Sequence, residues 1–389
     1  MLDYKKFDVI HRDLYKLDKI KKAAAATGHP ELGRSTFLVG GTNGKGSVVA
    51  YLSAWLQKLN YKVGLSISPH VIDESERIQI NSQAYSKEKR LQLEKKYEDA
   101  LKDLSFFERF TLLSFLAFRE ENVDVQVIEV GIGGRLDATN ICDPDVSIIC
   151  SIGTDHQELL GNSYREIAIE KAGIMRPRRK CFVPETLPQE AMAAIQDEAE
   201  KTKSSLCVIS QNGFEILRKT KSEHQQMNAL LAFSALQSFC EMKAVRTLDQ
   251  NQAELVALET GFPGRTQLLS KNPVWLVDGG HNREALIALQ GFLKQHFPKQ
   301  RFKVIFGMMR DKDPALIELL RPWIEELYFP QFFMERQWTP EELEERLLGQ
   351  KTSNLRELLE GFKAQKTSVL VCGSFYLAGD VLRILSEEN

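Results

Sequence analysis

The chain has 389 residues, is 43% hydrophobic, and carries 51 Lys and Arg against 53 Asp and Glu, for a net charge of −2. This is the composition of a folded globular protein, and it excludes a basic protein that coats nucleic acid and an acidic disordered chain. Because a single core stops growing at about 250–300 residues, we expect two domains.

Cysteine usage and the N-terminus favour a cytoplasmic protein. The six cysteines are scattered without a CxxC pair, which argues against a zinc ribbon or a disulfide framework. The charged N-terminal stretch has no apolar signal segment, and no apolar run reaches the roughly 20 residues of a membrane span. We therefore expect neither a membrane nor a nucleic acid as a partner.

The first two thirds of the chain alternate apolar strands with helical patterns. Predicted strands cover 36–39, 63–65, 123–130 and 146–152, and predicted helices cover 47–60, 87–104 and 107–119. Continuous apolar strands that alternate with helices are typical of a mostly parallel sheet covered on both faces. The fold class is therefore α/β.

Two glycines and a proline interrupt this pattern at 261–264, which predicts a hinge. The alternation then restarts, with strands at 274–277, 302–306 and 368–372 and helices at 283–296 and 315–321. We predict domains of residues 1–268 and 269–389, the second being a smaller α/β unit.

A glycine-rich segment, GGTNGKGS at 40–47, lies between the first strand and the first of these helices. Glycines allow backbone N–H groups to surround phosphate oxygens, the helix N-terminus adds a positive dipole, and Lys45 adds a charge. Ser47 can offer a hydroxyl to Mg²⁺. The strict P-loop pattern is not met, because Gly46 separates Lys45 from Ser47. The order of strand, glycines, lysine, serine and helix nevertheless predicts a nucleotide site rather than a tight turn.

Two further residues follow predicted strands. Glu129 ends the strand at 123–130, and ligands collect at the carboxyl ends of strands in open α/β sheets. Next to a phosphate loop, this carboxylate is expected to bind a metal ion. His156 follows the next strand, and the sequence leaves open whether it caps a helix or joins the metal site.

Ten motifs occur in one order along nearly the whole chain, among them EVGIGGRLDATN (129–140), EKAGI (170–174) and DGGHN (278–282). In these motifs the chain resembles the folylpolyglutamate synthase/dihydrofolate synthase family of the Mur ligase superfamily. The resemblance implies a P-loop ATPase domain joined to a smaller Rossmann-like domain. It also implies a ligase that adds L-glutamate to folates, and to 7,8-dihydropteroate, through an acyl phosphate, with release of ADP and phosphate.

The resemblance also assigns residues and cofactors. It implies ATP, two Mg²⁺ ions and a carbamylated Lys171, and we expect a monomer. The catalytic residues would be Lys45, Glu129, His156 and Lys171. ATP would be bound by Asn43, Gly44, Lys45, Gly46, Ser47, Asn228, Arg265, Asp278 and His281. The metal ligands would be Ser47, Ser68, Glu129 and His156. Folate would contact Phe107, Phe110, Leu136, Asp137 and Ala138, and glutamate would contact His281, Arg310 and Ser374.

Two other functions are compatible with the same phosphate loop. One is a Mur-type ligase that acts on a different acceptor carboxylate. The other is a P-loop NTPase that is not a ligase and that would hydrolyse ATP without glutamate. The chain departs from the family pattern at 23–35, in the region that helps bind dihydropteroate in bifunctional members, and has DGGHN where DxAHN is commoner.

Overall fold

A computed structural model describes residues 16–210, 222–332 and 336–387, which form two compact units. One unit comprises residues 6–69 and 75–260, of which residues from 16 onward and outside 211–221 are described. The other comprises residues 261–389 together with the short segment 70–74. The division at 260/261 falls at the start of the glycine–proline break at 261–264. We call these the N-terminal and the C-terminal unit.

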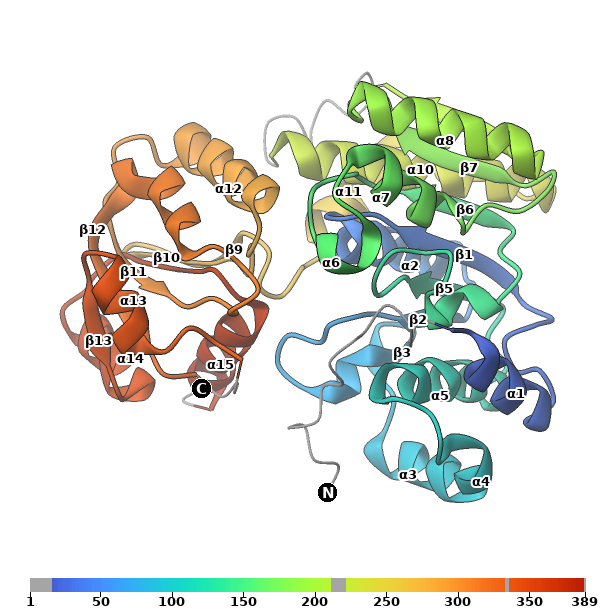
Figure 1. Cartoon of the computed structure of the whole chain (residues 1–389), viewed down its shortest axis with the longest axis horizontal. Coiled ribbons are helices and arrows are strands. Elements are labelled where there is room, and N and C mark those ends of the chain that lie inside the picture. The colour runs from blue at the N-terminus through green and yellow to red at the C-terminus, as the bar shows by residue number, and fades with distance from the viewer. Residues whose placement is uncertain (1–15, 211–221, 333–335, 388–389) are drawn as a thin grey trace. The chain divides into compact units, whose positions relative to one another are not determined.

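The N-terminal unit is built on an eight-stranded sheet with the order β4-β3-β2-β5-β1-β6-β7-β8 (Figure 1). Strands β2, β5, β1, β6, β7 and β8 are parallel neighbours; β3 pairs antiparallel with β2, and β4 pairs antiparallel with β3 at the edge. The strands are β1 (Ser35–Gly40), β2 (Val63–Ser66), β3 (Ile78–Ile80), β4 (Gln83–Ala84), β5 (Val125–Glu129), β6 (Val146–Ile149), β7 (Lys180–Pro184) and β8 (Ser205–Ile209). The central strands β1, β5 and β6 are almost wholly buried, as expected for a sheet covered on both faces.

Helices cover both faces of this sheet. Its helices are α1 (Asp18–Ala26), α2 (Lys45–Lys58), α3 (Lys87–Lys96), α4 (Glu98–Leu101), α5 (Phe106–Glu120), α6 (Gln157–Leu160), α7 (Tyr164–Ala172), α8 (Gln189–Thr202), α10 (Glu223–Met242) and α11 (Gln250–Glu259). Helix α2 packs on α10 and α11, whereas α5, α7 and α8 share a separate core with the other face. Short 3₁₀ turns, η2 (Glu74–Arg77) and η3 (Ala138–Ile141), complete the unit's loops, and Glu74 of η2 is counted with the C-terminal unit.

The C-terminal unit has a six-stranded sheet with the order β13-β12-β11-β14-β10-β9. All neighbours are parallel except β9, which is antiparallel to β10 at the edge. Its strands are β9 (Gln267–Lys271), β10 (Val274–Val277), β11 (Phe302–Phe306), β12 (Ile324–Pro330), β13 (Gln350–Thr352) and β14 (Val369–Cys372). Its helices are α12 (Arg283–His296), η4 (Pro314–Trp323), α13 (Pro340–Arg346), α14 (Leu355–Ala364) and α15 (Phe375–Ser386). Separate apolar clusters on the two faces of the sheet show that this unit, too, is a three-layer α/β domain.

Two helix predictions differ from the structure. The predicted helix at 87–104 is two helices, because the chain leaves helical geometry at Tyr97 (φ −116°, ψ 24°), whose hydroxyl accepts a hydrogen bond from Arg119. The predicted α-helix at 315–321 is the 3₁₀ helix η4, which begins at Pro314 and contains Pro322. A proline within the segment removes an N–H donor and disfavours a regular α-helix.

None of the described helices is long and apolar enough to cross a membrane.

Candidate active site

The phosphate loop joins β1 to α2 at the carboxyl edge of the N-terminal sheet. Gly44 (φ 87°) is in the left-handed region and precedes α2 without a side-chain cap, so the N–H groups of the first helical turn remain available to an anion. The loop is fixed to the end of β6: Asn43 N–H donates to Ser151 Oγ over 2.8 Å, and Gly153 N–H donates to Thr42 Oγ1 over 2.9 Å. These bonds make the loop a preformed cradle.

Lys45 folds back over this loop. Its Nζ donates to the carbonyl oxygens of Gly41 and Thr42 over 3.0 and 3.2 Å. The ammonium group is therefore held beside the backbone groups that would surround a phosphate, where it adds positive charge.

Glu129 and Ser68 lie at the ends of the neighbouring strands β5 and β2. The Ser68 N–H donates to Glu129 Oε2 over 3.0 Å, and the Glu129 side chain is buried. Ser68 Oγ is also buried and has no hydrogen-bond partner among the residues that the structure describes. A buried carboxylate beside an unsatisfied hydroxyl oxygen is a donor set that suits Mg²⁺.

Lys171 lies in the last turn of α7, with 4% of its surface exposed. Burial, and to a lesser extent the charge of Lys45, lowers the pKa of Lys171 to about 7, against the opposing effects of Asp155 and Asp137. A substantial fraction of this amine is therefore neutral near pH 7, and only a neutral amine can capture CO₂ as a carbamate.

His156 precedes α6 in a left-handed conformation (φ 52°), with its ring partly exposed. The ring nitrogens lie 4.0 Å from Asp155 Oδ1 and 3.9 Å from Glu158 Oε1. Within the described ranges, no three His, Cys, Asp or Glu side chains are grouped so that they could hold an ion by themselves. A metal ion beside His156 would need further oxygen ligands, which a phosphate group or a carbamate could supply.

Helix α10 brings two buried amides to the phosphate loop. A Cβ at Gly44 would lie 2.4 Å from Asn228 Oδ1, so the Asn228 side chain packs directly on this glycine. One turn earlier, Gln225 Nε2 donates to Ser47 Oγ over 3.1 Å. Ser47 is thus hydrogen-bonded to α10, and it is 1% exposed.

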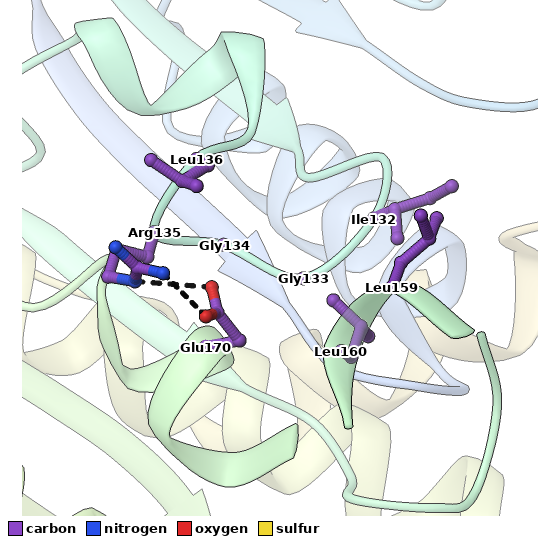
Figure 2. Close-up of a pocket in the computed structure, with 8 residues that line it drawn as sticks. All are labelled: Ile132, Gly133, Gly134, Arg135, Leu136, Leu159, Leu160 and Glu170. Carbon is purple, nitrogen blue, oxygen red and sulfur yellow. Dashed lines mark hydrogen bonds and ion pairs between the residues drawn. The ribbon is translucent and has the colours of Figure 1, made fainter. Parts of the chain in front are cut away.

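The loop after β5 forms a small pocket with α6 and α7 (Figure 2). Arg135 and Glu170 form an ion pair at 2.6 Å on one side of it, and the rest of the lining is mainly aliphatic and includes Leu136. The pocket is lined by Ile132, Gly133, Gly134, Arg135, Leu136, Leu159, Leu160 and Glu170.

The other folate-side predictions fall around the same loop. The buried Asp137 carboxylate accepts hydrogen bonds from the N–H groups of Ile132 and Thr139, and burial raises its pKa. Ala138 is buried beside it. Phe107 is partly buried and packs against Gly131, where a Cβ would lie 2.6 Å from the Phe107 ring.

Phe110 lies deeper than Phe107. It is 3% exposed, belongs to the apolar core, and packs under the guanidinium groups of Arg77 and Arg90 at 5.7 and 5.2 Å.

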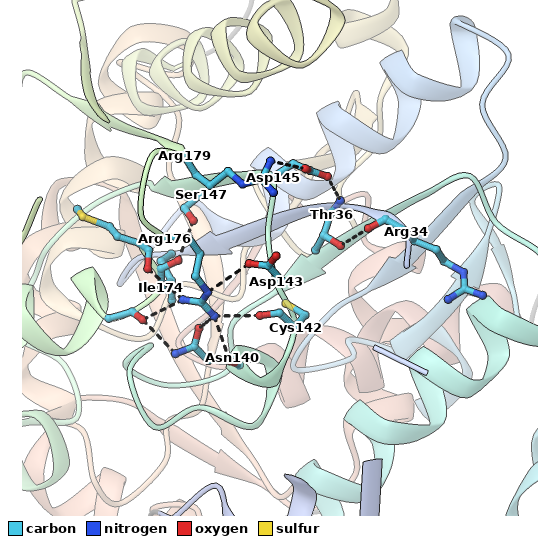
Figure 3. A network of polar contacts seen from close by, with 12 residues as sticks. Arg34, Thr36, Asn140, Cys142, Asp143, Asp145, Ser147, Ile174, Arg176 and Arg179 are labelled. Atoms are coloured by element: carbon cyan, nitrogen blue, oxygen red, sulfur yellow. Dashed lines mark hydrogen bonds and ion pairs between the residues drawn. The ribbon is translucent and has the colours of Figure 1, made fainter. Parts of the chain in front are cut away.

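A polar network holds this loop to the end of α7 (Figure 3). Arg176 Nη2 donates to Asn140 Oδ1 over 2.8 Å and to the Cys142 carbonyl over 2.9 Å. Asn140 Nδ2 in turn donates to the Gly173 carbonyl over 3.0 Å. The network therefore fixes the segment 140–142 relative to the turn that follows Lys171.

In the C-terminal unit, the predicted Asp278 and His281 follow β10, and Arg265 precedes β9, which pairs with β10. Asp278 accepts hydrogen bonds from Thr266 N–H (2.7 Å) and Gly280 N–H (2.8 Å), and burial raises its pKa. The Arg265 guanidinium lies 4.6 Å from the centroid of the Phe375 ring, and the His281 ring meets the same ring edge-on at 5.6 Å.

The two remaining residues predicted to bind glutamate, Ser374 and Arg310, each interact with other groups of the protein. Ser374 is buried, and its hydroxyl accepts from Tyr376 N–H over 3.1 Å at the start of α15. Arg310 follows β11 and forms an ion pair with Glu342 at 2.6 Å, over the ring of Trp338. The structure thus brings Arg265 and His281 together on the Phe375 ring, with Asp278 close to Arg265, and places Arg310 against a different set of side chains.

Two polar residues at the site were not singled out from the sequence. Asp155 is 8% exposed and lies close enough to influence the pKa of Lys171, and Gln225 holds Ser47. Asp155 directly precedes His156 after a strand end, which is a signal that could have found it. Gln225 lies in a helical pattern that reads as an ordinary amphipathic face.

This architecture is that of a Mur ligase. Residues 39–266 match the model of the Mur ligase middle domain, and residues 264–375 match the Mur ligase glutamate ligase domain. The chain is 31% identical to a dihydrofolate synthase/folylpolyglutamate synthase of Bacillus subtilis, over 95% of this chain and 94% of that protein. It is 30% identical to the Escherichia coli protein of the same name, over 95% and 91%.

Solved structures agree with these relatives. The Escherichia coli protein FolC in complex with DHPP and ADP has a TM-score of 0.85 and 27% identity, covering 99% of this chain and 96% of that one. A bifunctional folylpolyglutamate synthase/dihydrofolate synthase with Mn, AMPPNP and L-glutamate bound has a TM-score of 0.81 and 28% identity, covering 95% and 94%. The chain belongs to the dihydrofolate synthase/folylpolyglutamate synthase family and is an ATP-dependent glutamate ligase.

Proposed function

We propose that the chain joins L-glutamate to both 7,8-dihydropteroate and tetrahydrofolates. The observation that carries this proposal is the convergence, at one edge of the N-terminal sheet, of a phosphate loop, the Glu129–Ser68 pair and the buried Lys171. Nucleotide, metal and glutamate are bound by a structural relative, and DHPP and ADP are bound by another, which supports the same ligands here.

The reaction has two steps. The acceptor carboxylate attacks the γ-phosphorus of ATP, which forms an acyl phosphate and releases ADP. The amine of glutamate then attacks the acyl carbon, loses a proton, and expels phosphate as the amide forms. Such chemistry requires positioning and charge neutralisation rather than a covalent enzyme intermediate.

The protein's own groups divide these tasks. The N–H groups of the α2 first turn and Lys45 would bind the β- and γ-phosphates. Ser68 and Glu129 would hold one Mg²⁺, and His156 with a carbamate on Lys171 would hold a second. Bound Mg²⁺ supplies positive charge to the phosphates as negative charge develops on them. Ser47, whose hydroxyl oxygen accepts one hydrogen bond from Gln225, keeps a second lone pair and would join the metal ligands from the phosphate loop.

The remaining assignments follow the resemblance and the local geometry. Asn228, packed on Gly44, would lie on the adenine side, and the resemblance also assigns Arg265, Asp278 and His281 to the nucleotide. Ser374, His281 and Arg310 would bind glutamate. Phe107, Leu136 and Ala138 would contact the pterin-containing substrate. Asp137 holds the same loop through the Ile132 N–H, and Phe110, the deeper of the predicted aromatic residues, lies in the adjoining core.

The test is an assay of the purified chain with ATP, Mg²⁺ and L-glutamate, with 7,8-dihydropteroate and tetrahydrofolate in parallel. We expect ADP and an acceptor carrying one more glutamyl residue from each. Without acceptor no ADP should form, and without glutamate ADP should not exceed about one equivalent per enzyme. Sustained ADP release without glutamate would instead indicate a P-loop NTPase. Glutamate-dependent turnover only with a different carboxylate in a substrate panel would indicate another Mur-type ligase.

A further inference from the structure

Helix α10 contacts the phosphate loop at two points that flank Lys45. Asn228 packs on Gly44, and Gln225, one turn earlier on the same helix, bonds to Ser47. Both amides are only 5% exposed. The loop before α2 is thus bonded to Ser151, which follows β6, and the first turn of α2 is bonded to α10 through Gln225.

The buried amide of Gln225 has an unusual hydrogen-bonding pattern. Its Nε2 donates to Ser47 Oγ, but its Oε1 is buried and has no hydrogen-bond partner among the described residues. A buried carbonyl without a partner costs stability, and an apolar side chain of the same volume would avoid this cost. Stability alone therefore does not explain a glutamine at this position.

The bond from Gln225 reaches the part of the chain that would bind phosphate. Ser47 lies in the first turn of α2, whose N–H groups lack a side-chain cap. A shift of this turn by a fraction of an ångström would misalign several N–H groups with phosphate oxygens at once, because they move together as one helix end.

We propose that Gln225 is a positioning residue of the nucleotide site, which holds Ser47, and with it the first turn of α2, in the orientation that binds phosphate. This proposal rests on the nucleotide site of the proposed function. Gln225 acts through Ser47 and makes no contact with the nucleotide itself, so its effect is confined to the phosphate-bearing part of the ligand.

The experiment compares ADP with adenosine as ligands, without folate or glutamate, by titration of the wild type and Gln225→Met. We expect ADP to bind about tenfold more weakly to the variant, which corresponds to one hydrogen bond to a group beside an anion. Adenosine should bind equally to both, and the melting temperature of the variant should be unchanged or higher. The matched control is Gln237→Met, the same change at an exposed position of α10, which should alter nothing.

A double-mutant cycle with Ser47→Ala tests the route of the effect. If Gln225 acts through Ser47, adding Gln225→Met to Ser47→Ala should cause no further loss of ADP affinity. Equal losses for ADP and adenosine, an unchanged ADP affinity, or additive losses in the cycle would each overturn the proposal. Because these titrations need no ligase turnover, a failed ligase assay would leave their result interpretable.

Discussion

The main-chain N–H of Ser68 donates to Glu129 Oε2 over 3.0 Å, and this bond joins the ends of two neighbouring parallel strands. It orients the buried carboxylate while Ser68 Oγ remains without a hydrogen-bond partner in the described parts of the chain. Glu129 and Ser68 thus present oxygen lone pairs that a hard cation such as Mg²⁺ would accept.

Glu129→Gln should therefore abolish metal-dependent function while it preserves the fold. The amide has the shape of the carboxylate but lacks its charge, so we expect Mg²⁺ to bind at least about tenfold more weakly and turnover to fall about a hundredfold or more. The measurements are the Mg²⁺ dependence of ADP release and ADP binding in EDTA. ADP binding in EDTA should be unaffected, and full turnover at ordinary Mg²⁺ concentrations would contradict the metal assignment.

Lys171→Ala should remove turnover, because the carbamate would be lost with the amine. Short-chain carboxylates such as acetate could then occupy the space and restore a part of the activity. In the wild type, depletion of CO₂ and bicarbonate should lower activity, and adding bicarbonate should restore it. Carbon-13 NMR in the presence of ¹³C-labelled bicarbonate would detect the carbamate, and unchanged turnover in Lys171→Ala would eliminate it from the mechanism.

The lowered pKa of Lys171 also predicts how the free energy of unfolding depends on pH. Since its pKa is lowered in the folded state to about 7 from 10.5, the unfolded chain binds more protons between these values. The wild type should therefore gain stability relative to Lys171→Met as the pH rises from about 7 to about 10.5, by at most about 1.4 kcal/mol per pH unit. Urea unfolding of both proteins at several pH values, without bicarbonate, measures this difference. A difference that stays constant over this range would show that Lys171 is not buried as described.

The network around Arg176 should support the loop that follows β5. Arg176→Lys keeps the charge but loses the planar donor arrangement that reaches Asn140 and Cys142 together, so we expect a loss of about 1–3 kcal/mol in the free energy of unfolding. The loss of loop order should raise the KM for the folate-type acceptor more than the KM for ATP. Arg178→Lys is the matched control, because Arg178 is exposed. Equal stability of the two variants would contradict the role of this network.

The sequence predicted the phosphate loop and seven of the fourteen described strands, because continuous apolar runs end in glycine-rich or polar segments. It did not predict strands β3, β4, β7, β8, β9, β12 and β13. Local patterns could not predict that Ser68 lies beside Glu129, because they do not contain the order of strands in a parallel sheet; only the family resemblance grouped the two as metal ligands. The role of Gln225 was not predicted for a related reason. Its partner Ser47 is 178 residues away in the sequence, and helix periodicity carries no information about a single buried amide. The 3₁₀ geometry of η4 was not predicted, because the helical pattern of the segment was given more weight than its prolines.

Gly279, in the DGGHN motif, packs closely against an aromatic ring. A Cβ at Gly279 would lie 2.2 Å from the Phe375 ring, on which Arg265 and His281 also pack. Gly279→Ala should therefore displace Phe375 and cost about 1–3 kcal/mol in the free energy of unfolding. It should also weaken nucleotide binding, if Arg265 and His281 serve the nucleotide. Gly291→Ala in α12 is the control, because its Cβ would meet no atom within 4 Å, and alanine favours a helix by about 0.5–1 kcal/mol. Melting temperatures should thus fall for Gly279→Ala and stay level or rise for Gly291→Ala, and a Gly279→Ala protein as stable as the wild type would mean that the ring can move aside without cost.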